Sequence, residues 1–518
     1  MKNIARLIAV CFLLTSAIAR AGDHDLDERI EQYNYSATQQ YYSELISGET
    51  PDVAELNLLM NMLPKGGDIH HHYSGAIYAE TYLDWVEKQK YCIYRESNPA
   101  LQAEKYRIET RTQLAKGARQ ICIDVDTVRK DDVLYRELLQ VWSDKDFDNH
   151  YHEQPAPDQQ FFNTFGYFGP VSSSDYNEGL KGLKARAKAE NLQYLETMLK
   201  SAPEVDNPEL AKRINGLSPE AGEGEIRQAL TAYADFLGSD GEAQKKIGDY
   251  VKNLEAAAAG IGDNDFKLRF LSYVSRNNAP AKVFAGLYSA FAAAAQGGGL
   301  IVGVNLVGPE NGHVAMRDYR LHMRMFRFLR QRFPGVRLTL HAGELVLGMV
   351  PPEGLQSHIR EAVEIAGAER IGHGVDIPHE FKAAELLDIL KERQIAIEVN
   401  LTSNAFILGV QNEAHPVNVY RRHNVPIVIA TDDAGVSRTN LSGEYLLFVR
   451  RYKPSYPELK EIVYNSIRYS FLGEEEKIAE LRLLTERFDD FEAAVEKLAR
   501  TSAWGEGAPG GRPVAPGK

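Results

Sequence analysis

The sequence predicts an α/β protein with a (β/α)8 barrel, because short apolar segments alternate with stretches of helical periodicity. Each segment is apolar on both faces, which is typical of parallel strands covered by helices. Eight such segments match the eight strands of a closed barrel. The expected strands are 67–72, 192–198, 267–274, 300–307, 337–342, 370–374, 395–401 and 426–431. A doubly wound open sheet is the alternative, but no glycine-rich phosphate fingerprint follows any of these segments.

The spacing of the expected strands indicates crossover helices and one insertion. Helical patterns occupy gaps such as 315–333 and 381–393. More than one hundred residues separate the first strand from the second, far more than a single crossover helix needs. We therefore expect an inserted subdomain over about 85–155, within a barrel domain that spans 63–504.

Residues 1–21 have the features of a secretory signal peptide. Lys2 and Arg6 precede an apolar run over 7–19, and small residues then provide a cleavage site. The run is shorter than the ~20 residues that a membrane span needs, so a membrane anchor is the less favoured interpretation. We expect a protein that is exported to a periplasm or out of the cell.

The two ends of the remaining chain differ from the barrel. Residues 22–62 are polar and then helical in pattern, which predicts an N-terminal helical arm. Residues 505–518 (GEGAPGGRPVAPGK) are rich in Gly and Pro, which predicts a disordered tail.

The formal charge is -13 without a long Lys/Arg cluster, which disfavours nucleic acid as a partner. A small molecule is therefore the expected partner. No later segment is apolar enough to span a membrane.

Removal of the signal peptide would leave two cysteines, Cys92 and Cys122. In an oxidising compartment, these either form a disulfide or remain two separate buried thiols, and we expect the disulfide.

Side chains that can bind a metal ion or transfer a proton lie at the C-terminal ends of several expected strands. They are His70, His72, His341, Glu344, His373, Asp432 and Asp433. Along a strand, alternate residues share a face, so His70 and His72 project together while His71 points away and packs elsewhere. Each histidine alone is better explained as a hydrogen-bonded core or surface residue. Together, at the end of a barrel where active sites form, they predict one site.

Three histidine nitrogens and one carboxylate oxygen suit a zinc ion, and an open ligand position makes such a site catalytic. In that case, His373 could orient or deprotonate a water molecule, Glu344 could protonate a substrate atom, and Asp433 could bind a polar substrate edge. His150 and His152 form a competing pair, but they lie in a polar, Pro-containing stretch that we interpret as a solvated loop.

Four separated segments resemble the signatures of the adenosine deaminase family, in the family's order. They are PKGGDIHHHYSG, LTLHAGE, RIGHG and VIATDDAG, and the resemblance covers roughly 60–80 and 160–500. It implies one Zn²⁺ per subunit, with four zinc ligands: His70, His72, His341 and Asp432. It also implies that Glu344 is the acid that protonates purine N1. His373 would act on the water, and Asp433 would hydrogen-bond purine N7.

Two weaker matches concern substrate binding. VNLVGPE resembles the segment whose glycine backbone contacts the purine, here Gly308. FFNTFGYFGP resembles an aromatic helix that lines the pocket, here Phe161 and Phe165, although ordinary core packing explains these two equally well. One departure is Ser74, which stands where the classical adenosine enzymes have an Asp that contacts the ribose.

The layout is most similar to the secreted adenosine deaminase-related growth factors, which implies a homodimer formed through the N-terminal arm. The resemblance implies hydrolytic deamination of adenosine or 2'-deoxyadenosine to inosine or deoxyinosine plus ammonia, in purine nucleoside salvage. One alternative is a deaminase of another 6-aminopurine, such as adenine, methylthioadenosine or a modified adenosine. Another is a secreted binding protein without catalysis. The deaminase class with a C-x-x-C zinc motif is excluded, because the chain has no such motif.

Overall fold

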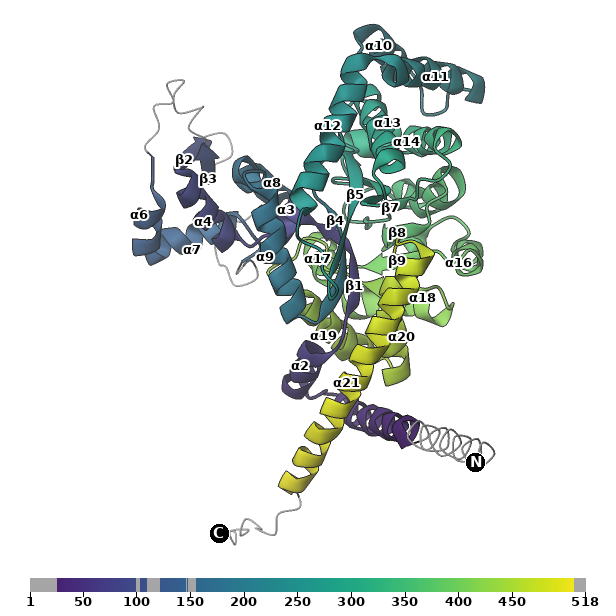
Figure 1. Cartoon of the computed structure of the whole chain (residues 1–518). Coiled ribbons are helices and arrows are strands. Elements are labelled where there is room, and N and C mark those ends of the chain that lie inside the picture. The colour runs from purple at the N-terminus through teal and green to yellow at the C-terminus, as the bar shows by residue number, and fades with distance from the viewer. Residues whose placement is uncertain (1–25, 99–102, 110–121, 146, 148–154, 507–518) are drawn as a thin grey trace, which may run out of the picture.

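Eight parallel strands form the centre of the fold in the computed structural model, which describes residues 26–98, 103–109, 122–145, 147 and 155–506 (Figure 1). The strands are β1 (Gly66–His72), β4 (Leu192–Met198), β5 (Lys267–Ser275), β6 (Ile301–Val307), β7 (Thr339–Ala342), β8 (Arg370–His373), β9 (Ala396–Val399) and β10 (Ile427–Ile429). All eight expected strands are confirmed, and their bounds differ from expectation by at most two residues.

Backbone hydrogen bonds close these strands into a ring. The strands pair in the orders β1-β4-β5-β6 and β7-β8-β9-β10. Val304 in β6 bridges to Leu338 just before β7, and the Val304 N–H donates to the Arg337 carbonyl at 3.0 Å. At the other junction, the Asp432 N–H donates to the His70 carbonyl at 3.0 Å. The barrel is therefore confirmed, because an open sheet would leave two unpaired edges here.

Helices between the strands cover the outside of the barrel (Figure 1). The helices expected over 315–333 and 381–393 are observed as α14 (His313–Arg332) and α16 (Ala383–Glu392). The covering helices include α9 (Tyr176–Ala189), α10 (Pro208–Asn215), α11 (Glu223–Ser239), α12 (Gly241–Ala258), α13 (Pro280–Gln296), α14 (His313–Arg332), α16 (Ala383–Glu392), α17 (Leu401–Leu408), α18 (Val417–Arg422), α19 (Leu441–Tyr452) and α20 (Tyr456–Arg468). None of the described helices is both long and apolar enough to cross a membrane.

The two ends of the described chain are helical. A helix over 26–46 and α2 (Val53–Met62) occupy the segment expected to be a helical arm. Helix α21 (Glu474–Glu506) runs two residues into the segment expected to be a disordered tail, so that boundary is wrong by two residues. The expected signal peptide, the remainder of the tail from 507, and the His150 and His152 pair lie outside the described residues.

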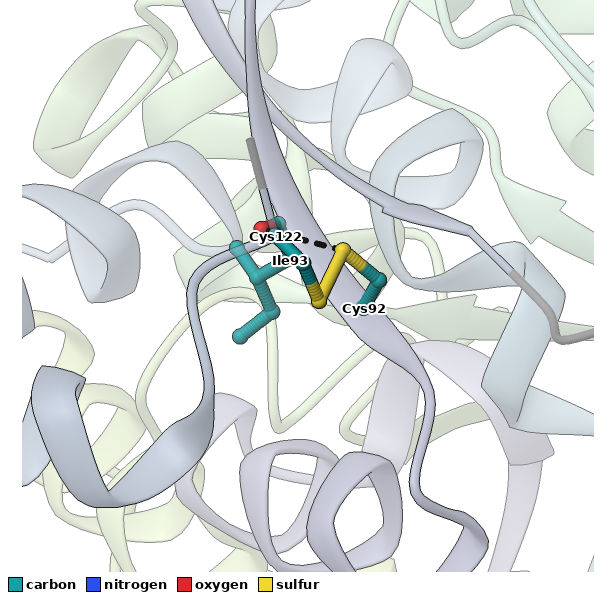
Figure 2. Close-up of a disulfide and its surroundings, with 3 residues drawn as sticks. All are labelled: Cys92, Ile93 and Cys122. Atoms are coloured by element: carbon teal, nitrogen blue, oxygen red, sulfur yellow. Dashed lines mark hydrogen bonds between the residues drawn. A yellow bond between two sulfur atoms is a disulfide. The ribbon is translucent and has the colours of Figure 1, made fainter. Parts of the chain in front are cut away.

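The long segment between β1 and β4 contains additional elements. They are α3 (Tyr73–Ala76), α4 (Ala79–Gln89), β2 (Cys92–Asn98), β3 (Ala103–Glu109), α6 (Val125–Lys130), α7 (Asp132–Val141) and α8 (Pro157–Ser172). Strands β2 and β3 form an antiparallel hairpin, and Cys92 is linked to Cys122 by a disulfide with Cα atoms 5.2 Å apart (Figure 2). Ile93 and Ile123 exchange two backbone hydrogen bonds beside it. The expected disulfide is therefore confirmed.

Candidate active site

Three imidazole nitrogens and one carboxylate oxygen meet at the C-terminal ends of β1, β7 and β10. The groups are those of His70, His72, His341 and Asp432, whose ligand atoms all lie within 4.8 Å of one another. His72 Nε2 lies 3.2 Å from His341 Nε2 and 3.3 Å from Asp432 Oδ1. His70 Nε2 lies 3.5 Å from Asp432 Oδ1. The structure thus brings together the four side chains that the sequence predicted as metal ligands.

This arrangement fits a divalent cation. Zinc bound at 2.0–2.1 Å to each of four tetrahedral ligands separates neighbouring ligand atoms by about 3.4 Å, close to the distances observed. His70 Nε2 is buried and has no hydrogen-bond partner among the described residues, a state that costs free energy unless a cation accepts its lone pair. The donor set of three nitrogens and one oxygen is also one that zinc prefers.

Two buried side chains hold the ligand imidazoles in the form that binds a metal. His70 Nδ1 is 2.6 Å from Glu398 Oε2, and His341 Nδ1 is 3.0 Å from Asn305 Oδ1. Both partner atoms are acceptors, so each Nδ1 carries the proton and each Nε2 presents its lone pair.

The charges around His70 indicate that the site requires a positive charge. Burial acts to lower the pKa of His70, but the nearby carboxylates of Asp432 and Glu398 outweigh it and raise that pKa to about 10. Burial lowers the pKa of His72 to about 4, so this imidazole is neutral. A bound cation would satisfy the two carboxylates and leave all three imidazoles neutral.

Glu398 belongs to a buried ion-pair network below the site. Arg370 Nε donates to Glu398 Oε1 and Arg370 Nη2 donates to Glu196 Oε2, both at 2.6 Å. Thr339 Oγ1 donates to Glu398 Oε1 at 2.7 Å. With these donors and His70, both oxygens of Glu398 are satisfied, so its orientation toward His70 is held in place.

Glu344 follows β7 in a turn held by another carboxylate. The N–H groups of Gly343 and Glu344 donate to the two oxygens of Glu310, at 3.1 and 2.9 Å. Burial raises the pKa of Glu344 well above its usual value, and the nearby charges of Asp432 and Glu310 add to this. A cation beside Asp432 would offset part of that charge effect, but burial would persist. Glu344 is therefore a carboxyl group suited to carry a proton at neutral pH.

A chain of hydrogen bonds orients His373. The Val417 N–H donates to His415 Nδ1 at 3.2 Å, so the proton of His415 is on Nε2, which is 3.2 Å from Asn404 Oδ1. Asn404 Nδ2 in turn donates to His373 Nδ1 at 2.9 Å. This places the proton of His373 on Nε2, 3.9 Å from Asp432 Oδ2. Burial lowers the pKa of His373 to about 3, so the ring is a neutral hydrogen-bond donor toward the metal site.

His373 and Asp432 share an uncommon backbone conformation. Their φ angles are +68° and +59°, in the left-handed region that residues other than Gly and Asn seldom adopt. Gly372 precedes His373, and a Cβ at Gly372 would lie 2.7 Å from His70 Cε1. Only glycine at 372 therefore allows the His70 ring to lie where it does. Strained backbone of this kind concentrates at functional sites.

Part of the chain is similar to known proteins. The family model "Adenosine deaminase" matches residues 239–487, which include His341, Glu344, His373 and Asp432. Over these residues the chain is similar to the adenosine deaminase family. An adenosine deaminase of Yersinia pseudotuberculosis is 33% identical over 227 residues, which are 44% of this chain and 62% of that protein. One from Clostridium perfringens is 33% identical over 179 residues, 34% of this chain and 48% of that protein. The chain thus spans about half of the length of the latter.

Several solved structures share the fold. The Arabidopsis ADAL structure complexed with IMP gives a TM-score of 0.52 at 18% identity and covers 82% of this chain and 97% of its own. The Arabidopsis N6-mAMP deaminase MAPDA gives a TM-score of 0.50 at 19% identity and covers 82% of this chain and 99% of its own. At such identities, these structures support the barrel and nothing finer.

The other adenosine deaminase signature residues lie around the ligand group. Asp433 is buried beside Asp432, and a Cβ at Gly75 would overlap its carboxylate, so Gly75 makes room for it. Burial, together with the charge of Asp432, raises the pKa of Asp433 well above its usual value. Gly308 follows β6 with a φ of +100°, which a non-glycine residue would adopt only with strain.

Three further residues expected to touch the substrate lie in α3 and α8. Ser74 is half-buried in α3, directly after the histidines of β1. Phe161 is buried and Phe165 half-buried in α8, and their ring centroids are 6.0 Å apart. Phe161 also contacts Phe406 of α17, with centroids 6.5 Å apart. The predicted packing role of His71 agrees with its hydrogen bond to Thr197 Oγ1 at 2.8 Å.

The sequence patterns did not identify the residues that support the candidate site. They are Asn305, Glu310, Arg370, Glu398, Asn404 and His415. Two signals were available. Glu398 is a charged residue inside the apolar segment IAIEVNL, and Glu310 ends the segment VNLVGPE that was quoted for its glycine. Asn404 and His415 carry no such signal, because their role depends on where α17 and α18 place them.

Proposed function

We propose that the protein is a zinc-dependent hydrolytic deaminase of adenosine and 2'-deoxyadenosine. The observation that carries this proposal is the position of two further groups beside the four-ligand cluster, the proton-carrying Glu344 and the neutral His373. A site that bound zinc for structure alone would need neither. A secreted binding protein without catalysis would not require the buried network that orients both residues.

A bound Zn²⁺ would supply a Lewis acid that makes water nucleophilic at neutral pH. Glu344 donates its proton to purine N1, which makes C6 electrophilic. His373 donates a hydrogen bond from Nε2 and thereby orients the attacking water. Asp433, protonated because of its raised pKa, donates to purine N7, which can only accept. Water adds at C6, one of its protons passes to N6 as the C6–N6 bond breaks, the other restores the proton of Glu344, and the products are inosine and ammonia.

The nature of the sugar depends on Ser74. A serine is shorter than the Asp of the classical adenosine enzymes and carries no charge, so ribose recognition differs at this position. This is the observation that supports the second candidate, deamination of another 6-aminopurine such as adenine, methylthioadenosine or a modified adenosine.

Ammonia release from the purified protein supplied with zinc separates these candidates. The substrates are adenosine, deoxyadenosine, adenine, methylthioadenosine and AMP, each tested with and without a chelator. We expect chelator-sensitive turnover of adenosine and deoxyadenosine. Turnover of a different aminopurine would preserve the chemistry and replace the substrate. No ammonia from any of the five, with zinc bound, would reject the enzyme.

We also propose that the protein is exported and acts in purine nucleoside salvage outside the cytoplasm. The pattern of residues 1–21 and the disulfide between Cys92 and Cys122 support this, because disulfides persist in oxidising compartments. N-terminal sequencing of the protein recovered from the periplasm or medium should begin near Gly22. Full-length protein confined to the cytoplasm would contradict export.

A homodimer is the assembly we propose. On the helix over 26–46, Leu26, Ile30 and Tyr33 are 57%, 49% and 54% exposed. Their spacing places them on one face, and such an exposed apolar stripe favours contact with a second copy. Sedimentation velocity should give the mass of a dimer, and Ile30→Asp should shift it toward the monomer. A monomer at micromolar concentration in the wild type would reject the proposal.

A further inference from the structure

A second pocket lies at the end of the barrel opposite to the candidate active site. Its volume is about 400 Å³, and it opens between the segments that lead into β7, β8 and β9. The lining residues that matter here are Arg330, Arg337, Glu369, Arg393, Arg468, Tyr469 and Lys477. The first turn of α21 contributes Lys477 to this wall, and Figure 1 shows the start of α21 beside β8 and β9.

The pocket concentrates positive charge in an acidic protein. Four arginines and one lysine line it against a single carboxylate among the described lining residues, whereas the whole chain has a formal charge of -13. Arg330 and Arg337 share Glu369 at 3.5 and 3.4 Å. Two cations on one carboxylate leave an excess of positive charge that an anion would neutralise.

The remaining cations are also weakly neutralised. The Arg393 side chain is exposed and makes no ion pair or hydrogen bond with any described residue. Lys477 pairs with Glu474 at 3.5 Å, but Glu474 is 80% exposed and therefore screened by water. Arg468 pairs with Glu461 on its own helix. Arg393 can therefore turn toward a ligand without breaking an ion pair or a side-chain hydrogen bond to a described residue.

The wall of the pocket is rigidly supported. Arg370 Nη1 donates to the Tyr469 carbonyl at 3.0 Å, and the Arg370 guanidinium lies 3.9 Å from the centre of the Phe471 ring. The Tyr469 hydroxyl donates to Gln394 Oε1 at 2.7 Å, which links the segment after α20 to the segment before β9. A wall that is already ordered loses little conformational entropy when a ligand binds.

We propose that this basic pocket binds a small phosphorylated molecule, separately from the active site. The planar guanidinium groups match the geometry of phosphate oxygens, which they can contact with two hydrogen bonds each. The volume is in the range of small-molecule sites. The net negative charge of the chain disfavours a long polyanion such as RNA, which would have to extend beyond the pocket.

Calorimetric titration of the full chain with inorganic tripolyphosphate tests the site. We expect one site per chain, with an affinity that falls as salt is raised. The double variant Arg337→Gln, Arg393→Gln should bind about 10–100-fold more weakly, because two charge-assisted contacts are lost. Both side chains are substantially exposed, at 43% for Arg337, so the fold should persist, which circular dichroism checks.

The control variant is Lys212→Gln, Arg213→Gln on α10, which removes the same charge from exposed positions outside the pocket. It should bind within about twofold of the wild type. Tripolyphosphate also binds metal ions, so equal affinity in the wild type and the pocket variant would place it at the active-site metal and overturn the proposal. The absence of binding would overturn it as well. The proposal would also be overturned if a single-stranded oligonucleotide bound more tightly than tripolyphosphate and the pocket variant bound it equally well.

Discussion

Glu344→Gln is expected to reduce turnover by about 10²–10⁴-fold while the metal content stays that of the wild type. Glutamine keeps the shape and the hydrogen-bonding reach of the side chain but has no acidic proton to give to purine N1. The carboxylate of Glu344 belongs to none of the four ligand positions of His70, His72, His341 and Asp432, so the metal should remain bound. Steady-state ammonia release and metal analysis of the same sample measure both quantities.

The matched control for this variant is Glu353→Gln, on the exposed part of the same loop. Its turnover should equal that of the wild type. Normal turnover in Glu344→Gln would show that another group protonates the substrate. Loss of both turnover and metal would instead indicate that Glu344 supports the metal site, and the assignment of the acid would then have to be abandoned.

Arg370→Met is expected to lower the free energy of unfolding by about 3–5 kcal/mol, because it leaves buried charges without a partner. Arg370 is 1% exposed and lies 2.6 Å from carboxylate oxygens of both Glu196 and Glu398. Burial acts to raise the pKa of Glu398, but Arg370 and His70 outweigh burial and hold that pKa at about 2. Without Arg370, burial would raise the pKa of Glu398 and favour its protonated form, which is a weaker acceptor for His70, so metal affinity should fall by about 10–100-fold.

Chemical denaturation with the metal held constant measures the first effect, and competition with a chelator measures the second. The control is Arg320→Met, whose guanidinium is 51% exposed and whose ion pairs with Glu220 and Glu361 are 3.6 and 3.7 Å long. Such surface pairs contribute about 0–1 kcal/mol, so this variant should be nearly neutral. If both substitutions lowered the free energy of unfolding by similar amounts, the buried network would contribute no more to stability than a surface ion pair.

The strands and the metal ligands were accessible from the sequence because both follow from local patterns. A parallel strand buried on both faces is a short apolar run, and its C-terminal end is marked by the polar residues that follow. Two histidines at i and i+2 point to the same face, so the pair at His70 and His72 needed no distant information. The insertion was visible only as excess length, and its hairpin was not predicted.

The sequence by itself thus determined the barrel, the position of the candidate site and the four side chains that meet as candidate metal ligands. Only the tertiary structure decided how those side chains are held. His70 and Glu398 are 328 residues apart in the chain, and Asn404 reaches His373 from the helix after the next strand. The same holds for the basic pocket, which collects cations from four separate segments. Periodicity within one segment carries no information about partners that meet only when the ring of strands closes.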